Sequence, residues 1–427
     1  MERKIFISIL GTGYYNPTKY FFDEISGSET KTRFVQEAAI KQFCSNWNDY
    51  DKIFVFLTKS ARITNWVNPA QEKNEKESYT GLIEVLKKLE LKAELIDKDI
   101  PDGKDEKEIW EIFQIIFKQL KENDKIYFDI THAFRSLPML LMVLINYSKF
   151  LKNIEVKSIT YGNHQAEKNG YSPIINLTAF SQLQDWTSAA DEFINFGSVD
   201  KLVNLSFAKI NPILKESKGK NESASTLKKL NSELPSFVKN IQTSRGMNII
   251  LNNEGSKINK IFYEFKQDNI KPLSPILEKI SKVVLPFNKA DNIKNGFFAV
   301  SWCINNNLIQ QGITLLKESI TTLICDEINL DFKEEKNRNI VDSAFTIIKE
   351  NIDEEKWERD AGENKDITKI VIKKSKYLLL LNKEFNIISS IRNDINHAGF
   401  KENSINKPGN FKKILNELLS DILKKIK

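Results

Sequence analysis

An arginine and a histidine near the end of the chain could together cleave RNA without a metal ion. Arg392, Asn393 and His397 lie in the segment RNDINH. RNA supplies its own nucleophile, the 2′-hydroxyl, so cleavage needs a group that moves protons and a cation that stabilises the transition state. Histidine suits the first task because its unperturbed pKa is about 6.5. Arginine suits the second because its fixed fork of donors binds phosphate oxygens.

One chain supplies only one such histidine, whereas acid–base cleavage needs both a proton acceptor and a proton donor. A two-fold dimer that juxtaposes two Arg392/His397 pairs would supply both, because an isologous interface repeats every residue across its axis. A structural role is the alternative, in which His397 caps helix carbonyls near Gly399. The residue types alone leave both roles open.

A second polar cluster follows an apolar run near residue 130. Its members are Asp129, Thr131, His132, Arg135 and Ser136. We expect Thr131 to cap the helix that follows, which would place His132, Arg135 and Ser136 near a helix N-terminus, where an anion is favoured. The cluster suits a ligand that carries phosphate or a nucleotide. A capped helix with an Asp129–Arg135 ion pair is the plainer alternative.

A third cluster, Gly11–Tyr14, directly follows the apolar run Lys4–Leu10. Glycine at such a turn lets backbone N–H groups approach a phosphate closely. The dinucleotide-binding fingerprint would need a third glycine, but position 16 is Asn16, which disfavours a nicotinamide-dependent enzyme. A tight turn that only ends the strand is the alternative.

Metal binding is a further hypothesis for these clusters. Asp129, His132 and His164 could supply three ligands, but the chain has no H-E-x-x-H motif and no paired Cys/His spacing. We therefore predict no metal site.

Composition describes an ordinary globular protein. The chain has 427 residues, of which 41% are hydrophobic and 28% charged, with a net charge of +6. That length predicts two or three domains, and the small surplus of positive charge does not itself indicate nucleic-acid binding. The three cysteines are far apart, which favours reduced thiols and a cytoplasmic location. No apolar run approaches the roughly 18–20 residues that span a bilayer, so we expect no membrane association.

Strand and helix patterns alternate over the first 180 residues, which predicts a mostly parallel sheet covered by helices. The expected strands are Lys4–Leu10, Lys52–Leu57, Lys92–Ile96, Lys125–Ile130, Glu155–Tyr161 and an edge strand at Tyr171–Leu177. The expected helices are Lys31–Asn46, Ser78–Leu89, Lys104–Lys121 and Thr131–Phe150. Ligands bind at the carboxyl ends of such strands, which is where the two polar clusters of this half lie.

Helical patterns replace strand patterns after residue 180. The expected helices are Leu183–Phe196, Leu227–Thr243, Ile258–Gln267, Phe297–Asn305, Leu308–Ile328, Ile340–Asn351, Tyr377–Ile391 and Phe411–Ile426. The polar segments Lys215–Ser225 and Asp353–Asp366 are expected to be loops. The prediction is an N-terminal α/β domain joined to an all-helical half.

Three motifs together resemble a known family. The run FDITHAFRSLP is similar to the D-x-T-H-G-x-R-x-x-P signature of a CRISPR-associated family, and the strand ending in LGTG fits the same group. The R-x4-H element in RNDINHAGF resembles the HEPN ribonuclease motif. In this order, they resemble the CARF–HEPN ribonucleases that act beside type III CRISPR effector complexes.

The resemblance implies a Rossmann-like CARF domain at 1–180, a helical linker or HEPN extension at 181–290, and a HEPN ribonuclease domain at 291–427. It implies a homodimer or a higher oligomer that needs no cofactor. A cyclic oligoadenylate, with the tetra-adenylate favoured over the hexa-adenylate, would activate metal-independent cleavage of single-stranded RNA. The ligand motifs fall on Gly11, Thr12, Gly13, Asp129, Thr131, His132 and Arg135, with Tyr14 and Ser136 added from the same clusters. The catalytic motif falls on Arg392 and His397, with Asn393 at the polar position after the arginine.

The sequence departs from the family pattern at one position. Ala133 stands where the family has glycine, and alanine would be disfavoured there if the backbone needed a positive φ. Slow degradation of the activator by Thr12, Thr131 or His132 stays open. The alternative function is a nucleotide-sensing regulator or scaffold that cuts nothing, which would have no need of Arg392 and His397.

Overall fold

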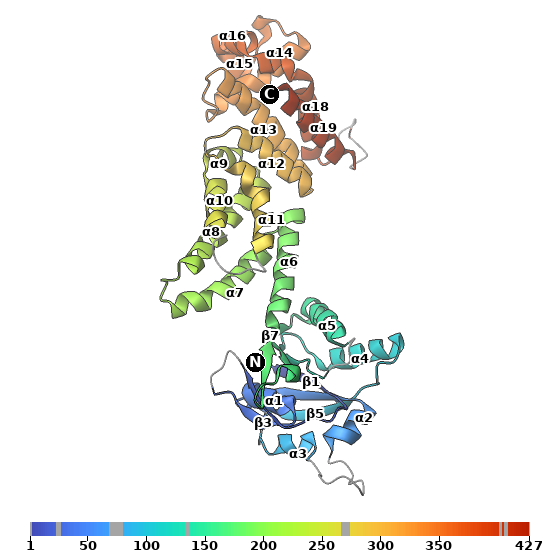
Figure 1. The fold of residues 1–427 in the computed structure, drawn as a ribbon. Helices are drawn as coiled ribbons and strands as arrows, with labels where there is room; N and C mark the ends of the chain where they lie inside the picture. Colours follow the sequence, from blue (N-terminus) through green and yellow to red (C-terminus); the bar gives the residue numbers. More distant parts are fainter. Residues whose placement is uncertain are drawn as a thin grey trace. The chain divides into compact units, whose positions relative to one another are not determined.

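The computed structural model describes residues 2–22, 27–67, 80–132, 137–265, 274–400, 404 and 409–426 (Figure 1). The chain divides into two compact units, Met1–Gln184 and Asp185–Lys427, and the boundary falls within helix α6 (Thr178–Phe196). Across the described ranges, no helix combines the length and apolar character needed to cross a bilayer. The predicted further division of the helical half at residue 290 stays a prediction.

The N-terminal unit is built on one eight-stranded sheet with the order β3-β2-β8-β7-β6-β1-β4-β5. Its pairs are parallel except for β2–β3 and β7–β8. The strands are β1 (Lys4–Leu10), β2 (Thr18–Phe22), β3 (Thr30–Thr32), β4 (Lys52–Leu57), β5 (Glu94–Asp99), β6 (Lys125–Asp129), β7 (Glu155–Gly162) and β8 (Tyr171–Asn176).

Strand β1 lies at the centre of this sheet because nearly all of its side chains are apolar and can be buried on both faces. Every residue from Ile5 to Leu10 is buried. After β1 the chain forms β2 and β3 at the far edge of the sheet, then adds β4 and β5 on one side of β1, and finally adds β6 and β7 on the other side. The sheet therefore has a topological switch point between β1 and β6, where ligands bind in open α/β sheets.

Helices cover both faces of the sheet, as the alternation predicted. Helices α1 (Val35–Cys44) and α3 (Leu82–Lys87) contribute to the core that contains Phe6 and Leu10. Helices α4 (Glu106–Gln119) and α5 (Leu137–Lys152) contribute to the core on the other face, where Ile5, Ile7 and Ile9 point. Two packed layers of helix therefore fix the positions of the central strands.

Three expectations for this unit were wrong. The sequence patterns missed β2 and β3, and as a result β8 is an internal strand between β2 and β7 rather than the predicted edge. The helix expected to start at Thr131 is described from Leu137, and Thr131 lies in a turn.

The C-terminal unit is helical throughout its described residues. After α6, the α-helices are α7 (Asp200–Glu216), α8 (Glu222–Gln242), α9 (Gly246–Leu251), α10 (Glu254–Phe265), α11 (Ser274–Val284), α12 (Lys294–Asn305), α13 (Ile309–Glu327), α14 (Glu335–Glu350), α15 (Arg359–Glu363), α16 (Lys365–Lys374), α17 (Lys376–Leu380), α18 (Asn382–Asn396) and α19 (Asn410–Lys425). The patterns missed α7 and several short helices. The charged segment Asp353–Asp366, expected to be a loop, instead holds the 3-10 helix Glu354–Lys356, all of α15 and the start of α16.

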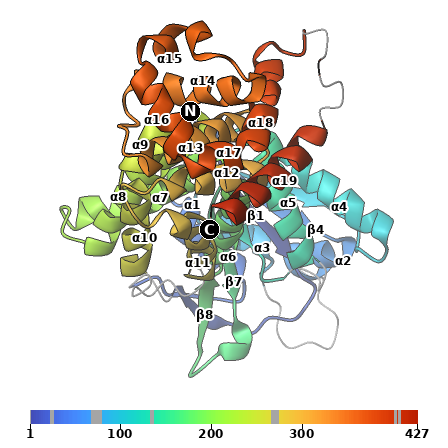
Figure 2. The same cartoon turned by 90° about the horizontal axis from the view of Figure 1, so that it is seen from above.

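Helix α13 organises this unit. It packs against α12, α14 and α18 (Figures 1 and 2), and most of its residues from Gly312 to Cys325 are buried. The rings of Phe345 on α14 and Phe385 on α18 stack with centroids 3.7 Å apart. This packing brings together residues of α13, α14 and α18 that are far apart in the sequence.

Candidate functional site

The two polar clusters of the N-terminal unit lie at the same edge of the sheet. Strands β1 and β6 are neighbours, with Ser8 opposite Asp129. The turn Gly11–Tyr14 and the turn that contains Thr131 and His132 therefore follow adjacent strand ends. In the first turn the residues Thr12, Gly13 and Tyr14 are exposed.

Asp129 lies beneath this edge, where it anchors the second turn. Only 2% of the residue is exposed. Its carboxylate accepts hydrogen bonds from the Ser8 hydroxyl at 2.7 Å, the Thr131 N–H at 3.1 Å and the Thr131 hydroxyl at 2.5 Å. Burial raises the pKa of Asp129, although these hydrogen bonds oppose the shift. The carboxylate therefore holds this turn in place.

The described hydrogen bonds of the Thr131 hydroxyl go to residues at the ends of two strands. The hydroxyl donates to Asp129 and accepts a hydrogen bond from the N–H of Gly162 at 2.8 Å. Both partners are at strand ends, so this hydroxyl ties β6 to β7. Position 162 must be glycine because a Cβ there would lie 2.5 Å from Cγ2 of Val35.

His132 stacks on Tyr15 at this edge. Their ring centroids are 4.2 Å apart. The His132 Nε2 atom is enclosed and has no hydrogen-bond partner among the described residues. Burial, followed by the charge of His164, lowers the pKa of His132 to about 4, so the ring is neutral at neutral pH. It could act as a hydrogen-bonding group or a stacking surface without carrying charge.

The glycine turn is held by Asn65, which the sequence analysis did not identify. The Asn65 side-chain amide donates to the carbonyl oxygens of Gly11 at 2.8 Å and Gly13 at 2.9 Å. Asn65 is buried and comes from a π-helical turn, Arg62–Trp66. Gly11 is required by close packing, since a Cβ there would lie 2.4 Å from the Tyr15 hydroxyl oxygen.

A second residue that the motifs missed, Arg33, provides a cation at this edge. Its Nε donates to the Tyr15 carbonyl at 2.8 Å, and its guanidinium carbon lies 4.5 Å from the centre of the Tyr14 ring. Tyr14 is 63% exposed. The exposed ring and the half-buried cation are therefore presented together beside the glycine turn.

Two predicted ligand residues, Arg135 and Ser136, lie outside the described residues, as does Ala133. The described chain contains no cluster of three or more His, Cys, Asp or Glu side chains that could hold a metal ion. The metal hypothesis for Asp129, His132 and His164 therefore finds no support. His164 instead lies within 3.3 Å of the Ser172 hydroxyl.

In the helical unit, α18 carries Arg392 and Asn393, and His397 is the first residue after its end. Backbone N–H groups cap the helix: His397 donates to the Asn393 carbonyl at 3.1 Å and Gly399 to the Asp394 carbonyl at 3.1 Å. The His397 residue is exposed, and its imidazole makes no hydrogen bond or ion pair with any described residue. The alternative role, a side-chain cap near Gly399, is not what the structure shows.

Arg392 instead faces a charge network that the sequence did not reveal. Its Nη1 lies 3.4 Å from one carboxylate oxygen of Glu318 on α13, and Arg338 on α14 donates to the other oxygen at 2.6 Å. Burial disfavours the Glu318 charge, but the hydrogen bond and charge of Arg338, helped by Lys317 and Arg392, outweigh it and lower the pKa of Glu318. Glu318 is thus an ionised group that orients both guanidinium groups.

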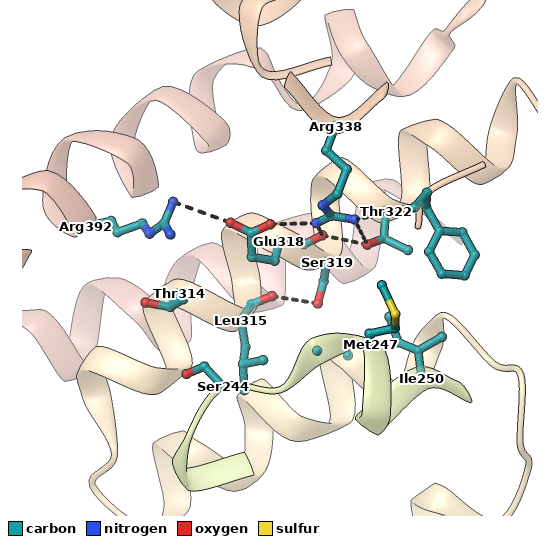
Figure 3. A pocket seen from close by; sticks show the side chains of 13 residues that line it. Ser244, Met247, Ile250, Thr314, Leu315, Glu318, Ser319, Thr322, Arg338 and Arg392 are labelled. Atoms are coloured by element: carbon teal, nitrogen blue, oxygen red, sulfur yellow. Dashed lines mark hydrogen bonds and ion pairs between the residues drawn. The ribbon is translucent and has the colours of Figure 1, made fainter. Parts of the chain in front are cut away.

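These side chains line a cavity of about 280 Å³ (Figure 3). Its walls come from α13 and four other segments, and the lining residues are Ser244, Gly246, Met247, Ile250, Gly296, Thr314, Leu315, Glu318, Ser319, Thr322, Phe332, Arg338 and Arg392. His397 is not among the lining residues. Within one chain, Arg392 and His397 therefore do not converge on one cavity.

Comparison with known proteins identifies the N-terminal unit. Residues 5–164 match the family model described as CRISPR system endoribonuclease Csx1, CARF domain. Residues 5–164 of this chain therefore form a CARF domain. A CRISPR-associated protein of Methanocaldococcus jannaschii is 32% identical over 105 residues, which are 24% of this chain and 17% of the relative.

These findings confirm two predictions for the CARF unit, which we define as Met1–Gln184. The resemblance to CRISPR-associated CARF proteins is confirmed, as is an α/β domain followed by a helical region. The helical unit lies outside the matched residues 5–164, so its HEPN character stays a prediction.

Proposed function

We propose that the CARF unit binds cyclic oligoadenylate and thereby controls metal-independent cleavage of single-stranded RNA by the helical unit in type III CRISPR defence. The observation that carries the proposal is the match of residues 5–164 to a CARF domain, combined with the two turns that this domain holds side by side at its switch point. Cyclic tetra-adenylate is the expected ring, with the hexa-adenylate as the alternative.

In this proposal the ligand lies on the exposed turn Gly11–Tyr14. Backbone N–H groups and the Thr12 hydroxyl would bind phosphate oxygens, and the Arg33 cation would offset their charge. The Tyr14 ring offers a stacking surface for adenine. Asn65 and Asp129 would contribute by holding the two turns in place, which limits the entropy lost on binding.

A symmetric ring suits a symmetric sensor. A cyclic homo-oligonucleotide can lie across a two-fold axis and contact the same turns of both protomers. It can activate the helical unit only if it binds the active arrangement of the dimer more tightly than the inactive one.

RNA cleavage would use Arg392 and His397 from both protomers. One His397 takes the proton of the 2′-hydroxyl, the 2′-oxygen attacks phosphorus, and the bond to the 5′-oxygen breaks as the other His397 donates a proton. Arg392 would stabilise the phosphorane, with Asn393 beside it as a hydrogen-bonding group. The exposure of His397 and the fixed charge of Arg392 beside Glu318 support these roles.

Calorimetric titration with cyclic tri-, tetra- and hexa-adenylate, and with linear tetra-adenylate as control, tests the sensor. The proposal predicts tight binding of one ring at one ring per dimer, and no comparable binding of the linear control. Equal affinity for linear and cyclic ligands would contradict it. Tight ring binding with no RNA cleavage would leave the CARF unit as a sensor and favour the non-catalytic regulator.

A further inference from the structure

A cavity lies beside Arg392, and its two sides differ in chemistry. Met247, Ile250 and Leu315 contribute an apolar side, whereas Glu318, Arg338 and Arg392 contribute a charged side (Figure 3). A volume of about 280 Å³ is just below the range of roughly 300–1,000 Å³ that is typical of pockets for drug-sized ligands. A small, flat molecule with apolar faces and a polar edge would fit this cavity.

Some hydrogen-bonding groups at the cavity are still open. The Nε atom of Arg392 is enclosed but has no hydrogen-bond partner among the described residues. Among the described residues, the Glu318 oxygen that faces Arg392 has only the 3.4 Å ion pair, whereas the other oxygen accepts the short hydrogen bond from Arg338. The cavity therefore presents an unfilled donor next to an incompletely filled acceptor, and a buried donor without a partner is costly.

The ionised Glu318 decides which part of a nucleotide could enter. The Glu318 carboxylate offsets one of the two guanidinium charges, and it would repel a phosphate oxygen placed in direct contact with it, which leaves the phosphate to the other N–H groups of Arg392. A nucleobase has no charge and offers both donors and acceptors on its edge, and single-stranded RNA is recognised through bases that are extruded in this way. An exocyclic amino group offers two N–H donors to the Glu318 carboxylate, whereas uracil offers only its N3–H, so bases with an amino group are favoured over uracil.

We propose that this cavity receives one extruded, amino-bearing base of the RNA substrate, next to the phosphate that is cleaved. The proposal rests on the proposed function, because that function puts Arg392 at the scissile phosphate. The base would stack along Met247, which is 48% exposed, and its edge would meet Glu318 and the Arg392 Nε. Arg392 has five N–H donors, so it can serve the base edge and the phosphate together.

The test combines a change in the enzyme with a change in the substrate. Met247→Trp would fill the cavity, and Met247→Leu is the matched control because it conserves volume and apolar character. Each full-length protein, activated by its ring, would be given RNAs in which the nucleotides flanking the cleavage site carry adenine, uracil or no base. Binding of the same RNAs with a 2′-deoxy block at the cleaved nucleotide gives a readout that does not depend on activity.

For wild type and Met247→Leu, removing the base at one flanking position should lower kcat/KM and RNA affinity about tenfold, with uracil intermediate. For Met247→Trp the ratio of kcat/KM between RNAs with and without this base should fall to about one, while the affinity for the cyclic oligoadenylate stays unchanged. The proposed base-binding role of the cavity would be wrong if the wild-type protein cleaved all three RNAs equally, or if Met247→Trp still distinguished them as fully as the wild type does. Either result would leave the proposed function unaffected. No cleavage by wild type with any ring would overturn the proposed function itself, and the pocket's role with it.

Discussion

Replacing Gly11 by alanine should disrupt the proposed ligand-binding edge of the CARF unit through one identifiable clash. An ideal Cβ at this position lies 2.4 Å from the Tyr15 hydroxyl oxygen and 3.2 Å from the His132 Cβ. The Tyr15 ring cannot move away freely, because it stacks on His132 and packs edge-on against Phe34, with centroids 6.2 Å apart. The alanine would therefore displace Tyr15 and, with it, the turn that carries His132.

The expected cost follows from overpacking, which typically destabilises a core by about 1–3 kcal/mol. For a unit of this size, each kcal/mol lowers Tm by about 2–4 °C, so Gly11→Ala should lower the Tm of the CARF unit by several degrees. Ring affinity should also fall at least tenfold, because the displaced turn forms part of the proposed ligand edge. Gly13→Ala provides a milder comparison for stability, since its Cβ would lie 3.3 Å from the nearest Tyr15 ring atom.

Tyr15→Phe supplies the decisive control because it removes the atom that clashes. Differential scanning calorimetry of the full chain, with and without ring, would follow Gly11→Ala, Tyr15→Phe and the double variant. The double variant should be more stable than the sum of the two single changes predicts. Additive losses, or a Gly11→Ala variant as stable as wild type, would refute this reasoning about the glycine.

Three further predictions concern other residues of the two sites. Asn65→Ala removes two hydrogen bonds to the glycine turn, so it should lower the free energy of unfolding by about 1–3 kcal/mol and weaken binding of the cyclic oligoadenylate in calorimetry. An unchanged affinity would show that the turn keeps its conformation without Asn65. His132 has a pKa lowered from 6.5 to about 4, so it contributes stability above pH 6.5 that is lost as pH falls towards 4. In urea denaturation at a series of pH values, His132→Gln should reduce the fall in the free energy of unfolding between pH 6.5 and pH 4. An unchanged slope in this range would contradict the lowered pKa of His132. Glu318→Gln should lower kcat of RNA cleavage about tenfold or more, because Arg392 would lose the carboxylate that orients its guanidinium group. Glu318→Asp should have an intermediate kcat. A change in KM alone would argue that Glu318 does not position Arg392.

The central strands of the sheet were predictable because each is marked by an apolar pattern within its own sequence. β1 and β4 are continuous apolar runs, and such runs indicate strands buried on both faces. β2 and β3 carry no such signal, since their short sequences TKYFF and TKT mix lysine with threonine and aromatic residues. They are strands because they pair with each other and with the distant β8, and no local pattern reports that pairing.

The sites were predictable only where motifs mark them. The turns at Gly11 and Asp129 follow strand ends, so the switch-point rule found them. Asn65, Glu318 and Arg338 contact partners that are distant in the sequence. The sequence pattern of a helix does not distinguish a single buried polar residue from an exposed one, so these three residues could not be identified in advance. The pairing of Arg392 with Glu318 depends on the packing of α18 against α13, which no spacing within either helix encodes.

The central claim is that a cyclic oligoadenylate switches on RNA cleavage by Arg392 and His397. The most direct measurement is cleavage of a fluorogenic single-stranded RNA by the full chain in EDTA, with no ring and with cyclic tri-, tetra- or hexa-adenylate. The account predicts cleavage with one ring, cyclic tetra-adenylate first, and a rate at background for His397→Ala under the same conditions. Ring-independent cleavage, cleavage that EDTA abolishes, or a fully active His397→Ala variant would contradict it.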